Sequence, residues 1–346
     1  MTMKAAVLEE YNKLIVKEVE VPLPGPDEVL IRVRSVGICG SDVHGYDGTS
    51  GRRIPPVIMG HEAAGEIQAV GSSVTQWAVG QRVTFDSTIY QMDDWYSRRG
   101  WYNLSDGRRV LGVSCDEYRQ DGAFAEYVVV PEHVLYRIPD SLSFDHAALS
   151  EPLAVALHGV TLTSVEIGDT VAVVGAGVIG LLVIAAVALR GCRSIIVSDV
   201  ADSRLNVAAK LGATHMVNPN RGQDLSEICA ECTNGRGADA VIEAVGLEQT
   251  IQAGVAAVRR GGTVTILGNI SPKVALPMQR IVAGQLRVQG SCAIRDEFPA
   301  AITLLSKGHV PARQLISASV PLEDAPSMFD KLHARDPELL KVILHP

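Results

Sequence analysis

The residues whose types and spacing best fit a metal site are Cys39, His61 and Glu62. A thiolate, an imidazole and a carboxylate are three of the groups that Zn²⁺ prefers as ligands. His61 and Glu62 are adjacent, and Cys39 lies about twenty residues before them. Neighbouring residues on an extended strand point to opposite faces, so both reach one metal only if the backbone bends. Gly60 and Gly65 flank the pair and would allow that bend.

A glycine motif indicates a second kind of chemistry. Thr170–Val174 is a continuous apolar run of the kind buried in a parallel sheet, and the glycines 175, 177 and 180 follow it directly. The segment after them, to about residue 190, is predicted as a helix. A strand, a G-x-G-x-x-G turn and a helix are the context in which this motif binds a dinucleotide. Gly175 would make the tight turn, Gly177 would let the backbone approach the pyrophosphate, and Gly180 would allow close helix packing.

An acid in the expected place favours NAD over NADP. Asp199 follows Gly180 by nineteen residues, at the end of the predicted strand 194–199. Its carboxylate is placed to accept hydrogen bonds from ribose hydroxyls and would repel a 2′-phosphate. Arg204 could partly offset that repulsion. The sequence therefore predicts NAD, with dual use of NAD and NADP left open.

The elements that position the metal cluster are predicted to be β-strands. Short β-rich or alternating runs recur about every ten residues, with turn residues between them, which suggests a barrel-like or sandwich-like domain. The expected strands are 4–8, 14–18, 28–36, 66–70, 82–85 and 124–130. The segment 91–114 interrupts them, being polar and aromatic, and is expected to be a surface lobe, solvated or serving as a lid or an oligomer contact.

The glycine motif lies in a part of the chain with a different pattern of secondary structure. Residues 144–162 have helical periodicity, and strands and helices then alternate. The further expected elements are the helix 203–211, the strands 238–243 and 263–267, and a closing strand at 339–344. This alternation predicts a doubly wound parallel sheet.

The composition fits a globular protein of about two domains. The chain has 346 residues, 47% of them hydrophobic, and a net charge of −8 without a basic cluster. We therefore expect neither nucleic acid nor a membrane as a partner. The start of the chain reaches charge too early for a signal peptide, and no apolar run is long enough to span a bilayer. Six scattered cysteines are typical of free thiols, so we expect a cytoplasmic protein.

The motifs resemble those of the zinc-dependent medium-chain alcohol dehydrogenases, in particular the sorbitol (polyol) and threonine dehydrogenase branch. The resemblance covers essentially the whole chain and rests on the runs 37–44, 60–65, 121–127 and 150–153 together with the glycine motif. It implies an α/β protein, with a GroES-like β-barrel catalytic domain and a Rossmann domain. The implied boundaries are 1–155 for the catalytic domain, 156–292 for the NAD-binding domain and 293–346 for a return to the catalytic domain.

The resemblance also implies the roles of individual residues. Cys39, His61 and Glu62 look like ligands of one catalytic zinc, and Glu151 looks like a further acid near the metal. Whether Glu62 or Glu151 binds directly stays open. Ser41 and His44 resemble the family's proton relay. The implied cofactor contacts are Gly175, Gly177, Val178, Ile179, Gly180, Asp199, Arg204, Leu267, Gly268, Ser291 and Cys292.

The sequence departs from many relatives in the lobe, where four cysteines hold a structural zinc. The corresponding positions here are Gln91, Asp94, Ser97 and Ser105, so we predict that this second zinc is absent. The lobe's shape would then come from packing of Trp95, Tyr96, Trp101 and Tyr102. Cys229 and Cys232 form an isolated C-x-x-C, which we interpret as free thiols buried in a helix.

The leading hypothesis is a zinc-dependent, NAD-linked enzyme that oxidises a secondary alcohol of a polyol or sugar-derived substrate to a ketone. The alternatives are a threonine-type amino-alcohol dehydrogenase, a zinc-free quinone or enoyl reductase, and a non-catalytic dinucleotide-binding protein. The sequence leaves the substrate open. Arg52, Arg53 and Arg295 could meet a carboxylate or phosphate, although surface arginines are the commoner explanation. Relatives suggest a homodimer or homotetramer.

Overall fold

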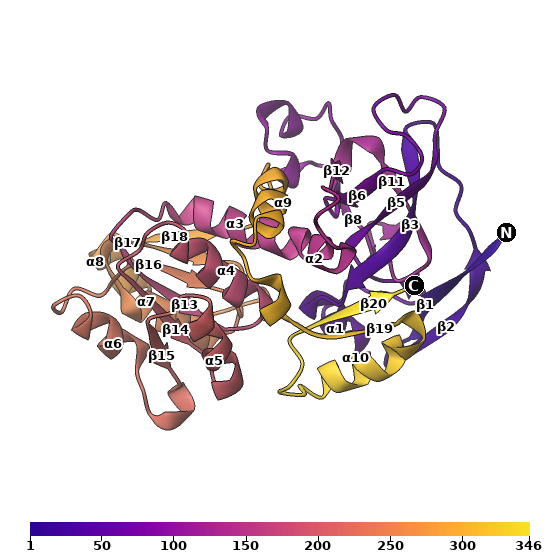
Figure 1. Cartoon of the computed structure of the whole chain (residues 1–346). Helices are drawn as coiled ribbons and strands as arrows, with labels where there is room; N and C mark the ends of the chain where they lie inside the picture. The colour runs from indigo at the N-terminus through magenta and orange to yellow at the C-terminus, as the bar shows by residue number, and fades with distance from the viewer. The chain divides into compact units, whose positions relative to one another are not determined.

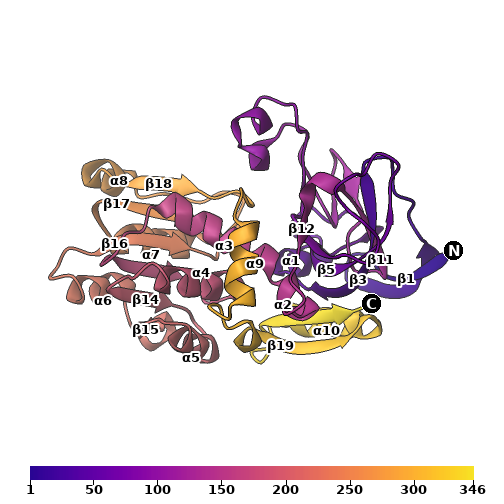
Figure 2. The same ribbon diagram turned by 45° about the horizontal axis from the view of Figure 1, so that its top comes forward.

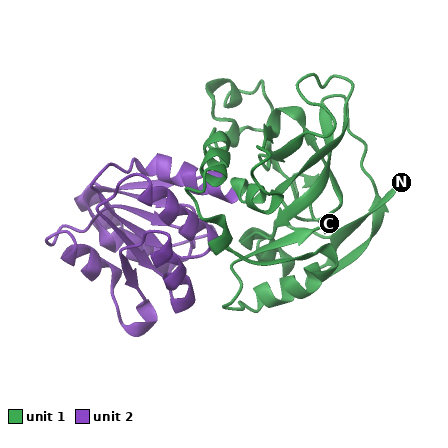
Figure 3. Ribbon diagram, viewed as in Figure 1, with its two compact units in different colours: residues 1–151, 294–346 green, residues 152–293 purple.

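The computed structural model describes residues 1–346, which form two compact units (Figure 3). Unit 1 comprises Met1–Glu151 and Ile294–Pro346, and unit 2 comprises Pro152–Ala293. The sequence analysis placed the two divisions after residues 155 and 292. The first division of the structure follows Glu151, four residues before the predicted one, and both positions lie within helix α3 (Ser150–Thr163). The start of α3 bonds to unit 1 through Glu151 and Ser87, whereas its end bonds to unit 2 through Thr163 and Thr265.

Unit 1 is built mainly from β-strands (Figure 1). Its main strands are β1 (Thr2–Glu10), β2 (Lys13–Glu20), β3 (Glu28–Gly37), β4 (Val57–Ile58), β5 (Glu62–Val70), β6 (Arg82–Phe85), β11 (Tyr127–Pro131), β12 (Leu135–Arg137), β19 (Ile316–Pro321) and β20 (Lys341–His345). Short strands are β7 (Thr88–Ile89), β8 (Arg109–Val110), β9 (Val113–Ser114) and β10 (Arg119–Gln120). Its helices are α1 (Gly40–Tyr46), α2 (Phe144–Ala148), α9 (Phe298–Ser306) and α10 (Ala325–His333), with 3₁₀ turns at Ser97–Arg99, Tyr102–Leu104, Glu132–Val134, Ala312–Gln314 and Leu322–Asp324.

The central sheet of unit 1 has the order β12-β6-β5-β3-β20-β19, with β11 also paired to β3, and β2-β1-β4 form a smaller sheet. Strand β20 comes from the end of the chain and pairs antiparallel with β3, so that Ile343 and Leu344 lie opposite Gly37 and Val36. The apolar core packs between these layers and includes Phe85, Phe124 and Phe329. The C-terminal segment is therefore an integral part of unit 1.

Unit 2 is a six-stranded parallel sheet of order β15-β14-β13-β16-β17-β18 (Figures 1 and 2). The strands are β13 (Thr170–Val174), β14 (Ser194–Ser198), β15 (His215–Val217), β16 (Ala238–Glu243), β17 (Val258–Ile266) and β18 (Arg287–Gly290). The helices are α3, α4 (Val178–Ala188), α5 (Asp202–Lys210), α6 (Leu225–Glu231), α7 (Glu248–Ala257) and α8 (Met278–Gly284), with a 3₁₀ turn at Pro219–Arg221. Because the order runs outward from β13 in both directions, right-handed crossovers place helices on both faces of the sheet.

The strands and helices expected from the sequence are present, with shifted ends. The predicted helix 144–162 is two helices, α2 and α3, which are separated at Leu149. The segment 91–114 is less solvated than expected, because Tyr102, Leu111 and Val113 are buried. None of the chain's helices combines the length and the apolar character that crossing a bilayer requires.

Candidate metal and dinucleotide sites

Cys39, His61 and Glu62 converge in unit 1. One candidate ligand atom of each residue lies within 4.8 Å of the corresponding atoms of the other two. Cys39 precedes helix α1, His61 immediately precedes strand β5, and Glu62 begins that strand. Tetrahedral zinc with bonds of about 2.0–2.3 Å places its ligand atoms roughly 3.5 Å apart. A thiol, an imidazole and a carboxylate at these separations fit a zinc ion that draws them slightly together.

The backbone bend that the sequence analysis required occurs at Gly60. Its φ is +94°, and a Cβ there would lie 2.6 Å from the ring of Phe124. A side chain at this position would therefore be both strained and obstructed. Gly65 acts differently, because its φ is not positive. A Cβ at Gly65 would meet the carbonyl oxygen of Arg32 at 2.1 Å, so this glycine permits close strand pairing.

A buried lysine lies beside the cluster. The ammonium group of Lys341, on β20, donates to the Glu62 carboxylate at 2.5 Å and to the carbonyl of Ile38 at 2.9 Å. Both partners of this ion pair are about 1% exposed. The sequence analysis missed Lys341. The sequence feature that could have identified it is a single cation within the apolar run of the predicted closing strand.

Glu151 lies near the cluster but outside the group of three converging side chains. It is 7% exposed, and its Oε1 accepts a hydrogen bond from Ser87 at 2.8 Å. Burial raises the pKa of the Glu151 carboxyl, and the charge of Glu62 raises it further. Burial likewise raises the pKa of the Cys39 thiol, with Glu62 again adding to the effect. The region therefore favours a cation that would stabilise these acids in their ionised forms.

Ser41 and His44 lie three residues apart on α1 and are both exposed. This spacing places them on one side of the helix. The Ser41 hydroxyl oxygen accepts a hydrogen bond from Arg53 at 3.3 Å. Arg53 itself is 3% exposed, and so it is not the surface arginine that the sequence suggested. Its guanidinium is paired with Asp42 on the same helix, at 2.9 Å.

The glycine motif of unit 2 has the expected strand–turn–helix setting. Gly175 follows β13 with φ +95°, and Gly177 is the N-cap of α4. A Cβ on Gly177 would meet no atom within 4 Å, so the backbone is accessible there. A Cβ on Gly180 would lie 1.8 Å from the carbonyl oxygen of Gly175, which explains the need for glycine where helix and turn touch.

Asp199 directly follows β14 and lies beside this turn. One carboxylate oxygen accepts from the backbone N–H of Ala176 at 2.7 Å, and the other accepts from Ala201 at 2.9 Å. Each oxygen retains a second lone pair for a ligand hydroxyl. The amide of Ser291 bonds to β17, and its buried hydroxyl has no hydrogen-bond partner.

A further carboxylate organises the neighbouring turn. Glu243, at the end of β16, is fully buried and accepts from the amides of Val245 and Gly246 and from the hydroxyl of Thr250. Its backbone oxygen accepts from Leu267 and Gly268, at 2.8 and 3.2 Å. The sequence analysis named those last two residues as cofactor contacts but did not single out Glu243, which the sequence shows only as one acid at a strand end.

Two family models match the chain. The alcohol dehydrogenase GroES-like domain matches residues 25–140, and the zinc-binding dehydrogenase model matches residues 178–307. The chain belongs to the zinc-type alcohol dehydrogenase family. The two units thus correspond to a GroES-like domain and a Rossmann domain, as the sequence resemblance implied.

Proteins similar to this dehydrogenase match it over its whole length. It is 37% identical to a sorbitol dehydrogenase of Bacillus subtilis, over 99% of this chain and 97% of the relative. A solved structure described as a zinc-binding dehydrogenase of Sinorhizobium meliloti bound to NADP is 35% identical, with a TM-score of 0.91 and full coverage of both chains. An Escherichia coli structure described as a short chain alcohol dehydrogenase complexed with NADH is 29% identical, with a TM-score of 0.91 over 100% of this chain and 99% of that one. The enzyme class and a nicotinamide cofactor follow from these matches.

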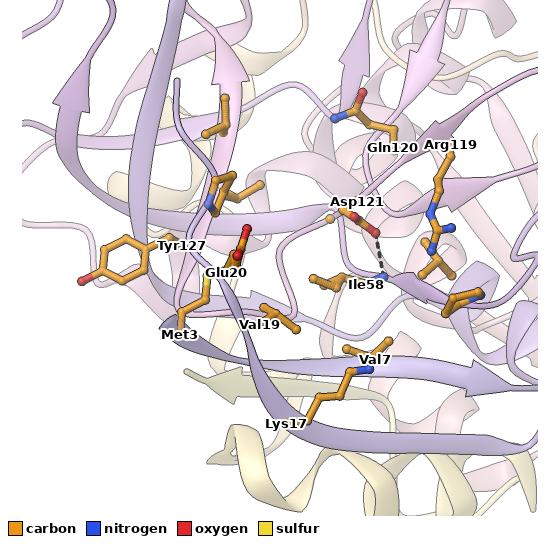
Figure 4. Close-up of a pocket in the computed structure, with 16 residues that line it drawn as sticks. Met3, Val7, Lys17, Val19, Glu20, Ile58, Arg119, Gln120, Asp121 and Tyr127 are labelled. Atoms are coloured by element: carbon orange, nitrogen blue, oxygen red, sulfur yellow. Dashed lines mark hydrogen bonds between the residues drawn. The ribbon is translucent and has the colours of Figure 1, made fainter. Parts of the chain in front are cut away.

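A separate pocket of about 340 Å³ lies in unit 1 (Figure 4). It is lined by residues of β1, β2, β4, β10 and β11 and includes none of the candidate zinc ligands. Asp121 at its edge accepts from the amide of Ile58 at 2.9 Å, and Lys17 is paired with Glu9. These two polar side chains thus link neighbouring segments of unit 1.

Proposed function

We propose that this dehydrogenase is zinc-dependent and NAD-linked, and that it oxidises a secondary alcohol of a polyol or sugar-derived substrate to the ketone. The observation that carries the proposal is the convergence of Cys39, His61 and Glu62 in a chain that also has the dinucleotide motif. The whole-length similarity to a sorbitol dehydrogenase supports the polyol class. A threonine-type amino alcohol is the alternative substrate.

Cys39, His61 and Glu62 would hold the zinc ion directly, and Glu151 would lie next to it. This assignment follows the group of converging atoms, from which Glu151 is absent. When bound, the ion supplies a Lewis acid that makes an alcohol more acidic. Ser41 accepts the proton of the substrate hydroxyl, and His44, exposed on the same side of α1, passes it to water. A nicotinamide held at the glycine motif would supply the acceptor for the hydride that leaves the substrate carbon.

NAD is the proposed cofactor, with one catalytic zinc and no structural zinc. The support for NAD is the Asp199 carboxylate beside the glycine turn, where a 2′-phosphate would meet negative charge. The same region includes Ile179 and Arg204 among the proposed contacts. We expect kcat/KM to be at least tenfold higher with NAD than with NADP, measured across polyols, sugar acids, sugar phosphates and threonine. Equal values with both cofactors would contradict the role of Asp199.

The zinc ligands are tested by substitution. We expect Cys39→Ser and His61→Ala to lose bound zinc and to reduce kcat by a factor of 10³ or more, because each removes a ligand. NADH binding, followed by fluorescence, should remain within about twofold of wild type, since the dinucleotide motif lies in unit 2. Undiminished activity in either variant would remove the mechanism. Loss of NADH binding would indicate general misfolding.

We further propose a cytoplasmic homodimer or homotetramer. Strand β18 is an edge strand whose four residues are all exposed, and the apolar side chains of Met278, Val282 and Val288 are exposed on or near it. Such an edge pairs readily with a second copy of the same chain. Sedimentation analysis of the purified protein gives the oligomeric state directly, and a monomer would exclude both forms. None of the six cysteines forms a disulfide bond, which fits a reducing compartment.

A further inference from the structure

Arg53 is a buried cation in a region that the proposed mechanism does not yet use. It lies in the segment between α1 and β4, and its backbone is fixed by a bridge to Ser114 of β9. Its side chain is only 4% exposed, and the side chain of its partner Asp42 is fully buried. A buried arginine requires a partner for its charge, and here that partner lies on the helix that carries Ser41.

The guanidinium makes four hydrogen bonds to three groups. Its Nε and one terminal nitrogen donate to Oδ1 of Asp42, at 3.3 and 2.9 Å. The same terminal nitrogen donates to the hydroxyl oxygen of Ser41 at 3.3 Å, and the other donates to the carbonyl of Arg52 at 3.0 Å. Gly45 provides the space for the side chain, because a Cβ there would lie 2.0 Å from Cγ of Arg53.

Asp42 connects this cation to two of the candidate zinc ligands. Its Oδ2 accepts from the backbone amide of Cys39 at 3.3 Å. Its Oδ1 lies 3.5 Å from Nδ1 of His61, a ring nitrogen that has no other partner. A single carboxylate therefore faces the backbone of one ligand and the ring of another. Arg53 donates to Oδ1, the same oxygen that faces the imidazole.

We propose that Arg53 is a positioning residue, which orients His61 and Cys39 through Asp42 and orients the Ser41 hydroxyl directly. This inference rests on the proposed function of the cluster as a zinc site. Arg53 neutralises Asp42 and fixes its rotamer, so that the carboxylate stays against the imidazole. By donating to the Ser41 oxygen, Arg53 also directs the hydroxyl hydrogen away from the guanidinium. Partners behind metal ligands of this kind change metal affinity by about 10–100-fold when they are removed.

The test compares zinc affinity in Arg53→Met, Arg53→Lys, Asp42→Asn and the double variant Asp42→Asn/Arg53→Met. Arg52→Met is the matched control, because Arg52 is the exposed neighbour and donates only weakly to Tyr118, at 3.4 Å. Zinc affinity is measured by competition with a chelator, and ligand geometry by the visible spectrum of the Co²⁺-substituted protein. NADH binding, followed by fluorescence, reports on unit 2 independently.

We expect Arg53→Met to weaken zinc binding about 10–100-fold and to alter the Co²⁺ spectrum, with NADH affinity unchanged within twofold. Arg53→Lys should recover part of the affinity, because an ammonium group keeps the charge but not the fork of donors. The double variant should bind zinc about as weakly as Asp42→Asn alone, because Arg53 acts through Asp42.

Additive losses in the double variant, or unchanged zinc affinity and Co²⁺ spectrum in Arg53→Met, would overturn the proposal even if activity falls. Should Arg53→Met not fold, the comparison of Arg53→Lys with Asp42→Asn decides by the same criteria. Failure of the proposed function has a different result, since wild-type protein would then bind no zinc at all.

Discussion

At the scale of single residues, the candidate zinc site is a buried group of acids balanced by one lysine. Cys39, Glu62 and Glu151 would together leave a zinc site with a net negative charge if all three were ionised. Lys341 makes it neutral. Burial alone would lower the pKa of Lys341, but the charges of Glu62 and Cys39 outweigh burial and raise it. The ammonium group therefore stays charged and holds one oxygen of Glu62, which leaves the other oxygen for a metal.

We expect Lys341→Met to destabilise unit 1 by about 3–5 kcal/mol, because it leaves the Glu62 carboxylate buried without its partner. Thermal melting measures the effect, and the exposed Lys307→Met is the matched control. The double variant Lys341→Met/Glu62→Gln should regain much of the stability, since it removes the unpaired charge, but it should bind zinc weakly. If Lys341→Met has the same melting temperature as the wild type, the ion pair does not stabilise the site.

At the scale of elements, the first part of the lobe, residues 91–106, is organised around one carboxylate. Asp94 accepts from the backbone amides of Ser97 and Asp106, at 2.7 and 2.9 Å, and from the hydroxyl of Ser105. Ser105 in turn accepts from the amide of Gln91. The four positions that would be cysteines in relatives with a structural zinc are thus joined here by hydrogen bonds. The hydrogen bond from Ser105 contributes most to lowering the pKa of Asp94, to about 2.

The aromatic packing of the lobe is only partly as the sequence suggested. Trp95 contacts Tyr96 and Trp101, and Arg99 stacks over Trp95 at 3.8 Å. Tyr102 instead stacks on Tyr90 and accepts from the amide of Asp296 through its hydroxyl, at 2.7 Å. Tyr102 therefore anchors the lobe to the rest of unit 1.

We expect Asp94→Ala to loosen the lobe, because two backbone amides and the Ser105 hydroxyl lose their common acceptor. Trypsin cleavage after Arg98 and Arg99 should become at least about tenfold faster, whereas the neighbouring exposed Asp93→Ala should have little effect. In the wild type, a chelator should not change this cleavage rate, and metal analysis should give one zinc ion per chain. Two zinc ions per chain would contradict the predicted loss of the structural site.

At the scale of the whole molecule, contacts distant in sequence attach the ends of unit 1 to its interior. Asp47, at the C-terminal end of α1, lies 3.1 Å from the imidazole of His333 on α10. Tyr46 donates from its hydroxyl to Asp330 on the same helix, or to the carbonyl of Asn12, both at 2.9 Å. The helix that carries Ser41 is therefore supported by the last part of the chain.

Acid should weaken this support. Burial opposes ionisation of Asp47, but hydrogen bonds from Thr49 and His333 lower its pKa from the ordinary value of 3.8 to about 2. A carboxyl whose pKa is lower in the folded than in the unfolded chain stabilises the fold at pH values above its unfolded-state pKa. That contribution is lost as the pH falls toward 2. We expect Asp47→Asn to cost about 1–2 kcal/mol at pH 7 and almost nothing near pH 2. Thermal melting at several pH values measures the difference.

The matched control for that series is Asp140→Asn. The Asp140 side chain is fully exposed, and its ion pair with Arg82 is loose, at 3.7 Å. Its substitution should change the melting temperature little at any pH. If Asp47→Asn lowers the stability of the fold by the same amount down to pH 2, the carboxylate charge is not the cause of the stabilisation.

The local features of this protein follow from its sequence, because they depend on neighbours in the chain. The doubly wound unit, the glycine turn and the position of Asp199 reflect periodicity and backbone freedom within short segments. The bend at Gly60, where φ is +94°, was expected for the same reason. The family also follows, since its motifs are short runs of residues.

Tertiary structure decided the partners of the buried charges. Lys341 meets Glu62 only because β20 pairs with β3, and these two residues are separated by 279 positions in the chain. Arg53 meets Asp42 because Gly45 leaves room on one face of α1. The sequence suggested a surface position for Arg53, as is usual for a charged side chain. A charged side chain can be buried only where another group compensates its charge. When that group is distant in the chain, the local sequence does not identify it.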